Sequence, residues 1–220
     1  MKRAKTLIDF PTFFSLTARI QNKRTGVYRW VTPECDLVLE GFPRSANTFL
    51  YRILRSALRS DQKIAHHVHR SQQVAMAVRY GVPAFVLYRP PLAAIASLLV
   101  RAQCKITIEQ CLADYVAFAD ATLALSGKDL VHVLTFDEVV SEPDVVANDI
   151  LAAIGSPAKV TPELVKRATV DERTNHIQSS LPNPVKERQK ASHLEKIVSL
   201  PYFDRAQSLY AQAEATKWRR

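Results

Sequence analysis

Four short apolar runs that alternate with helical patterns constrain the fold of this chain more than any other feature. The runs cover residues 36–41, 63–68, 84–89 and 131–136. The last two are continuous rather than alternating, which is typical of strands buried on both faces of a parallel sheet. The segments between and after the runs have helical periodicity, at 46–59, 70–80, 91–103, 107–126 and 142–154. This order predicts an α/β protein with a central parallel sheet flanked by helices.

Proline and glycine set the expected ends of these helices. Pro91 and Pro143 fall in first turns, where a missing N–H costs nothing. Gly81 follows the helix at 70–80, and Gly127 is expected to stop the helix at 107–126.

The length of 220 residues fits one domain over 1–220. We expect a nucleotide-binding core at about 36–155, with helical or loop elaborations at 1–35 and 160–220. The stretch 179–184, SSLPNP, is predicted to be a loop.

The charge balance favours an anionic partner. The net charge is +9 and the pI is about 9.6, which suits a nucleotide or a phosphorylated or sulfated molecule. No basic run is interleaved with aromatic residues, so we expect no nucleic-acid partner.

The N-terminal segment begins like a signal peptide, but Asp9 and Pro11 interrupt its apolar part. No apolar run reaches the roughly 18 residues of a membrane span. A short interfacial helix within 1–20 is the alternative, and its apolar side would contain Phe10, Phe13, Phe14 and Leu16.

The cysteines indicate the redox compartment. Cys35, Cys104 and Cys111 lack metal-ligand spacing, and three residues cannot all pair. We expect reduced, buried thiols in a cytoplasmic protein, with peripheral membrane contact through 1–20 as the alternative.

The first candidate site is the junction 41–48, GFPRSANT, between a strand and a helix. It resembles the phosphate-binding pattern G-x-x-x-x-G-K-[ST], but Ala46 replaces the second glycine and Asn47 replaces the lysine. Without that lysine, ATP or GTP hydrolysis is disfavoured. Helix-start N–H groups still attract anions, and Arg44 adds a guanidinium suited to phosphate or sulfate. The alternative is a plain turn capped by Ser45 or Asn47.

A buried strand that ends in an arginine is the second candidate site. Arg89 closes the run 84–89, and Ser97 lies eight residues on, about two turns into the next helix. A cation at such a strand tip needs an anionic partner. Ligands of α/β sheets bind where strands end and helices begin, which places this junction in a binding region. The alternative is an internal carboxylate that pairs with Arg89 and a space-filling role for Ser97.

Together the two junctions resemble the PAPS-dependent sulfotransferases, where PAPS is 3′-phosphoadenosine 5′-phosphosulfate. Residues 43–49 are similar to the family's P-K-S-G-T-T-W loop, which binds the 5′-phosphosulfate. Arg89 and Ser97 match the arginine and serine that bind the 3′-phosphate. The resemblance implies a P-loop-like fold and a set of PAPS-binding residues. These are Arg44, Ser45, Ala46, Asn47, Thr48, Phe49, Arg89 and Ser97.

The resemblance covers roughly 36–155 and has departures. Residues 135–155 are similar to the family's Y-E-D-L-x-x-x-P segment, with Phe136 in the tyrosine position. Leu92 replaces a frequent aspartate. The family's R-K-G-x-x-G-x-W segment over the 3′-phosphate has no clear counterpart, and the candidates for its role are Lys186, Arg188 and Lys190.

Three histidines lie at the end of the second predicted strand, where residues 66–69 read His-His-Val-His. The resemblance implies a general base there: His67, at about the family's spacing from Arg89, or His69. If the strand continues, these two share one face and His66 points to the other. An imidazole near its reference pKa of about 6.5 would take the acceptor's proton at physiological pH. The alternatives are a three-histidine metal site, which opposite strand directions disfavour, and histidines that only pack or cap a turn.

The resemblance therefore implies transfer of a sulfuryl group from PAPS to a hydroxyl or amine. Arg44, Thr48 and the loop amides would stabilise the leaving 5′-phosphate of PAP, with no metal required. The acceptor is unidentified: a small molecule, a carbohydrate or a lipid-linked compound. Two alternatives remain: a degenerate relative that binds PAP or a polyanion without turnover, and a P-loop kinase, which the missing lysine and Mg²⁺-binding carboxylates disfavour.

Overall fold

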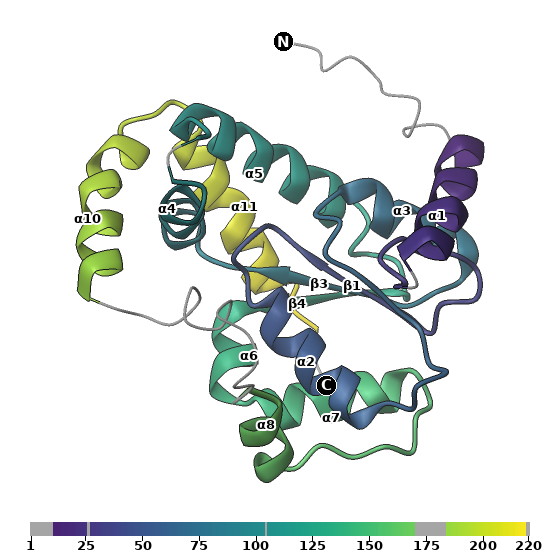
Figure 1. Ribbon diagram of the computed structural model, residues 1–220. Helices are drawn as coiled ribbons and strands as arrows, with labels where there is room; N and C mark the ends of the chain where they lie inside the picture. The colour runs from purple at the N-terminus through teal and green to yellow at the C-terminus, as the bar shows by residue number, and fades with distance from the viewer. Residues whose placement is uncertain (1–10, 26, 104, 170–183, 219–220) are drawn as a thin grey trace.

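A computed structural model describes residues 11–25, 27–103, 105–169 and 184–218. Its four strands are all parallel and form one sheet in the order β2–β1–β3–β4 (Figure 1). The strands are β1 (Leu37–Gly41), β2 (Ile64–His66), β3 (Ala84–Tyr88) and β4 (Val131–Thr135). The predicted α/β class with a central parallel sheet is confirmed.

Helices follow each strand and cover both faces of the sheet. They are α1 (Pro11–Thr25), α2 (Asn47–Ala57), α3 (Ser71–Tyr80), α4 (Pro91–Arg101), α5 (Ile108–Leu123), α6 (Phe136–Ser141), α7 (Pro143–Ala153), α8 (Pro162–Thr169), α10 (Pro184–Val198) and α11 (Phe203–Ala215). The predicted loop at 179–184 lies outside the described residues except for Pro184, which begins α10.

Two apolar clusters sandwich the sheet. One joins it to α2, α7 and α8, and the other joins it to α1, α3, α4, α5 and α11 (Figure 1). Neighbouring residues of β1 serve opposite clusters, since Leu37 and Leu39 pack into the first and Val38 into the second. Strands buried on both faces explain the continuous apolar runs in the sequence.

The helix ends mostly follow the predicted signals. Gly81 ends α3 with a φ of 71°, and Pro91 and Pro143 are the first residues of α4 and α7. Helix α5 ends at Leu123, ahead of Gly127, because the chain tightens into successive i→i+3 turns. Helix α6 was not predicted separately. A capping box between Thr135 and Glu138 starts it directly at the end of β4.

The second strand is shorter than predicted. β2 ends at His66, and His67 and His69 have φ values of 58° and 56°, in the left-handed region that cannot continue a strand. The condition under which His67 and His69 would share a strand face, a strand that continues through 66–69, is therefore not met. They belong to a turn between β2 and α3.

The thiols of Cys35 and Cys111 are free and buried, as predicted. Burial raises the pKa of both, that of Cys111 to about 11. Cys104 lies outside the described residues. Within the described ranges, no helix has the length and apolar character to cross a bilayer. Of the predicted interfacial face, only Leu16 has a described side chain, and it is 59% exposed.

Candidate functional site

The loop between β1 and α2 leaves a helix start open to an anion. Arg44 and Ala46 have φ values of 74° and 68° on either side of Ser45. Such alternation turns successive N–H groups toward one side of the chain. Ala46 is the N-cap residue of α2, and no side chain caps the first turn. The alternative, a turn capped by Ser45 or Asn47, is therefore wrong, and the helix-start N–H groups remain available.

Buried polar atoms in the same loop lack partners. Ser45 is fully buried, and its Oγ has no hydrogen bond within the described part of the chain. Asn47 donates from Nδ2 to the Phe42 carbonyl at 3.1 Å, while its Oδ1 is likewise unpaired. An unpaired buried polar group costs about 1–3 kcal/mol, so the Ser45 hydroxyl, which can donate, favours an anionic ligand. The Asn47 oxygen can only accept, so an anion would not supply its missing bond.

Gly41 fits tightly where β1 enters the loop. A Cβ at this position would lie 2.6 Å from the Leu87 carbonyl oxygen on β3 and 2.8 Å from Oδ1 of Asn47. Only glycine allows that close backbone approach. The first position of the GFPRSANT loop is thus fixed by packing.

Two hydrogen bonds join the first loop to the chain that follows β3, one to Arg89 and one to Ser97 in α4. Arg44 donates from Nε to Oγ of Ser97 at 3.0 Å, and Arg89 donates from Nη1 to the carbonyl oxygen of Arg44 at 2.9 Å. We call Arg44, Arg89 and Ser97 the arginine pole. Among the described residues, no carboxylate lies within 4.0 Å of either guanidinium. The alternative that Arg89 pairs with an internal carboxylate therefore has no support in the described chain.

Aromatic residues position Arg89. Its guanidinium lies 4.1 Å from the centroid of the Phe136 ring, and its carbonyl oxygen accepts a hydrogen bond from Tyr115 at 2.8 Å. Burial lowers the pKa of both arginines, and the charge of Arg44 lowers that of Arg89 further. Phe136 was noted in the sequence, but nothing in the pattern around Tyr115 indicated this role.

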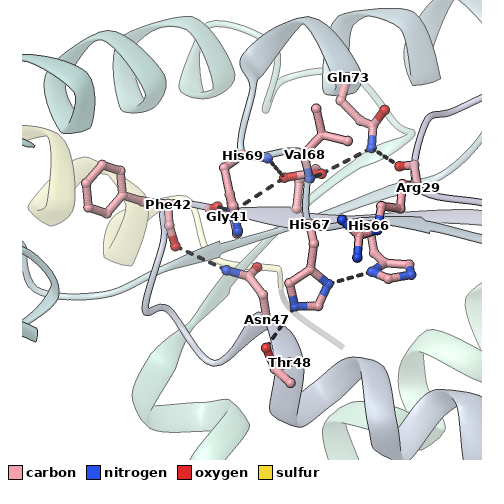
Figure 2. A network of polar contacts seen from close by, with 11 residues as sticks. Arg29, Gly41, Phe42, Asn47, Thr48, His66, His67, Val68, His69 and Gln73 are labelled. Carbon is pink, nitrogen blue, oxygen red and sulfur yellow. Dashed lines mark hydrogen bonds and ion pairs between the residues drawn. The ribbon is translucent and has the colours of Figure 1, made fainter. Parts of the chain in front are cut away.

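The histidine turn, residues 66–69, lies beside the first helical residues of α2 (Figure 2). His67 Nε2 is 2.8 Å from Oγ1 of Thr48, and its Nδ1 is 2.5 Å from Nδ1 of His66. His66 stacks on Tyr51, and its buried Nε2 has no hydrogen-bond partner among the described residues. Burial lowers the pKa of His66 to about 3 and that of His67 to about 4. Both rings are neutral at pH 7, and for His67, one of the two predicted bases, the expected pKa near 6.5 is wrong.

His69 is held differently from His67. Its Nδ1 lies 2.8 Å from the Gly41 carbonyl oxygen, which can only accept, so Nδ1 carries the proton. Nε2 then has a free lone pair, on a side chain that is 28% exposed. Burial lowers its pKa, and the bond to Gly41 opposes that effect.

A buried carboxylate that sequence reasoning missed supports the turn. Glu40, on β1, is fully buried and accepts hydrogen bonds from the N–H groups of Val68 and His69, both at 2.8 Å. Gln73 donates to it at 3.1 Å. Burial raises the pKa of Glu40 to about 7. A charged residue inside the apolar run 36–41 was the available signal.

Four of the six ring nitrogens of the three histidines contact protein atoms: both nitrogens of His67, which meet Thr48 and His66, Nδ1 of His66, and Nδ1 of His69, which meets Gly41. Within the described ranges, no group of three or more histidine, cysteine, aspartate or glutamate side chains is arranged to hold a metal ion.

The remaining predicted residues lie at the periphery of the candidate site or outside the described residues. Phe49 packs, partly buried, against the apolar cluster of α2. Lys190 on α10 pairs with Glu187 at 2.6 Å, and the charge of Glu187 acts on Arg89. The start of α10 therefore lies near the arginine pole. The side chain of Lys186 lies outside the described residues.

Comparisons with known proteins identify the fold. No family model matches the sequence, and no curated protein matches it. The structure is similar to that of mouse sulfotransferase SULT7A1 complexed with PAP, with a TM-score of 0.52 and 10% sequence identity. The match covers 90% of this chain and 95% of that chain. At this identity the likeness shows the fold, a parallel sheet flanked by helices.

Proposed function

We propose that this chain is a sulfotransferase that transfers a sulfuryl group from PAPS to a hydroxyl or amine of an acceptor. The observation that carries the proposal is the meeting of two sequence motifs 45 residues apart, through the bond from Arg89 to the Arg44 carbonyl. The fold shared with a PAP-bound sulfotransferase supports it.

The residues of the site fit a ligand with anionic groups at two positions. The unpaired Ser45 hydroxyl and the uncapped start of α2 suit one group, and the Arg89 and Ser97 side chains suit the other. By the resemblance in sequence, residues 44–49 would hold the 5′-phosphosulfate, and Arg89 and Ser97 the 3′-phosphate. PAPS supplies the sulfuryl group and leaves as PAP.

The loop would also stabilise the charge that builds on the leaving phosphate. Arg44 is half-buried, so its charge acts through a medium of lower dielectric than water. Thr48 and the N–H groups of the first turn of α2 add preorganised donors. These groups supply the positive charge that a metal ion supplies in kinases.

We assign the general base to His69. Its Nε2 can accept the acceptor's proton while Nδ1–H stays on the Gly41 carbonyl, so the ring needs no reorientation. His67 instead orients Thr48, because both of its ring nitrogens are engaged. A bound anion beside the turn would raise the lowered histidine pKa values toward the working range.

The alternative is a protein that binds PAP or a polyanion without turnover. Burial lowers the pKa of His69, the assigned base, and this favours the alternative, because a weaker base contributes less at pH 7. A P-loop kinase is disfavoured by Asn47 in the lysine position.

Two measurements test the proposal. Calorimetry should show tighter binding of PAP than of 5′-AMP or ATP. Radiolabelled PAPS, incubated with the protein and pooled small-molecule, carbohydrate and lipid extracts, should yield a labelled acceptor. PAP binding without transfer would support the alternative, a protein that binds PAP without turnover. Absence of PAP binding would overturn both the sulfotransferase and this alternative.

A further inference from the structure

We propose that Glu40 is a positioning residue whose carboxylate sets the conformation of the histidine turn and holds His69 toward the phosphate loop. This inference rests on the proposed function, since it assumes that the turn carries the base. Within the described chain, the side chain of Glu40 contacts Val68, His69 and Gln73, and neither the loop side chains nor the arginine pole.

The carboxylate replaces the strand pairing that the turn has lost. β2 pairs with β1 only through His66, so the N–H groups of Val68 and His69 have no strand partner. One carboxylate oxygen accepts from Val68 and the other from His69, both at 2.8 Å. This bidentate contact holds Val68 between two residues, His67 and His69, whose left-handed backbones are sparsely populated for side chains with a Cβ.

Gln73 fixes the carboxylate from the other side. Its Nε2 donates to Glu40 at 3.1 Å and to the Arg29 carbonyl at 2.8 Å, and its Oε1 accepts from the N–H of Val31 at 2.9 Å. The Arg29 carbonyl also accepts from the N–H of His66 at 3.0 Å. Figure 2 shows the contact of Gln73 with Arg29 and the contacts of His67 with His66 and Thr48. Gln73 thus links the Glu40 carboxylate to the Arg29 carbonyl, which also binds His66 at the start of the turn.

Two adjacent residues of β1 hold the two parts of His69. Glu40 binds its backbone N–H, and the Gly41 carbonyl binds its Nδ1. Oε2 of Glu40 lies 4.0 Å from that nitrogen, where a negative charge favours the imidazolium formed when Nε2 takes a proton. Since Gly41 begins the phosphate loop, a shift of Glu40 moves the base relative to the loop.

The test compares Glu40→Gln with a matched control, Asp36→Asn. Asp36 lies at the other end of β1 and accepts from the N–H of Lys63 at 2.6 Å, so it makes the same kind of contact away from the site. A glutamine offers one oxygen where three donors converge, and its own N–H₂ faces a backbone donor. We expect Glu40→Gln to lower the rate of transfer from PAPS about 10²-fold, as misplaced catalytic groups do, with PAP affinity little changed. Asp36→Asn should keep the wild-type rate.

Nitrogen NMR of the imidazole rings supplies a readout that needs no turnover. In the wild-type chain His69 should show a single tautomer with the proton on Nδ1, and in Glu40→Gln a mixture. If wild-type protein transfers no sulfuryl group, the proposed function fails, but this comparison still tests the positioning role. An unchanged His69 tautomer in folded Glu40→Gln would overturn the role.

Glu40→Asp covers the case in which Glu40→Gln does not fold. It keeps the charge but shortens the reach toward Val68 and His69. A mixed His69 tautomer with retained PAP binding would support the positioning role. A wild-type tautomer and rate would overturn it, because the length of the side chain would then be irrelevant.

Discussion

The arginine pole and the histidine turn lie at the same edge of one sheet but differ in charge: the pole carries two positive side chains, and the imidazoles of the turn are neutral. Arg44 and Arg89 stay positive, and their recorded hydrogen bonds go to neutral acceptors, the Ser97 hydroxyl and a backbone carbonyl. The histidine turn instead surrounds the buried carboxylate of Glu40, and burial keeps its imidazoles neutral. Fixed cations with no carboxylate in direct contact among the described residues suit binding of an anion, whereas neutral rings in set tautomers suit movement of a proton.

The largest expected effect comes from removing the proposed base in the histidine turn, which should affect transfer but not anion binding at the arginine pole. His69→Ala should reduce transfer about 10²–10⁴-fold, the usual contribution of a general base, and leave PAP binding nearly intact. Label transfer and calorimetry measure the two effects. His67→Ala is the matched control: loss of its bond to Thr48 should weaken PAP binding. If His67→Ala abolished transfer while His69→Ala remained active, the roles of the two histidines would be exchanged.

The charge of the arginine pole gives the next largest effect. Arg44→Ala should lower kcat about 10²–10³-fold, by analogy with removal of an oxyanion donor. Arg44→Lys should recover only part of the loss, because an ammonium cannot reproduce the Nε bond to Ser97 while its charge faces the ligand. Single-turnover measurement of kcat is the check. Unchanged turnover in Arg44→Ala would remove Arg44 from the transfer step.

Arg89 should affect binding more than chemistry. Arg89→Ala should weaken PAP about 10–100-fold, as expected for a hydrogen bond to a charged group, and 5′-AMP much less, because 5′-AMP lacks the 3′-phosphate. Arg59→Ala removes the same charge from a surface ion pair with Asp61 and should change neither affinity. Calorimetry with both nucleotides is the measurement. Equal weakening of PAP and 5′-AMP would mean that Arg89 binds another part of the ligand.

The two regions also differ in how far the sequence predicts them. The arginine pole is set by strand ends and spacing, so the tips of β1 and β3 were identified from apolar runs and from Arg89 at a strand end. The histidine turn depends on contacts of Glu40 with Val68 and His69, which lie 28 and 29 positions further along the chain. Backbone conformation with positive φ at His67 has no local sequence signal, since glycine is the usual residue there.

The pKa values of the histidines could not be predicted from the sequence either, because burial against distant parts of the chain lowers them. The expected pKa near 6.5 treated the histidines as if they were in water. The rings of His66 and His67 both contact Tyr51, a long-range packing that a single sequence does not show.

The smallest expected effect concerns the pH dependence of stability, to which the Glu40 carboxyl group and the imidazoles of the turn contribute with opposite sign. The pKa values of His66 and His67 are lowered, to about 3 and about 4, so between roughly pH 6.5 and pH 4 the unfolded chain binds more protons and stability falls on acidification. Glu40 acts in the opposite direction. Its pKa is raised to about 7, so the stability that it contributes is present below about pH 4.5 and is lost as the pH rises through 7.

Glu40→Gln removes the opposing contribution, and its stability should therefore fall more steeply than that of the wild type as the pH drops from 7 to 4.5. The difference in the free energy of unfolding between the two proteins should change by on the order of 2 kcal/mol across this range. Urea unfolding at intervals of half a pH unit measures it. Parallel curves would show that the carboxyl group of Glu40 titrates alike in the folded and unfolded chains, and the contrast between a fixed-charge pole and a titrating turn would then rest on the histidines alone.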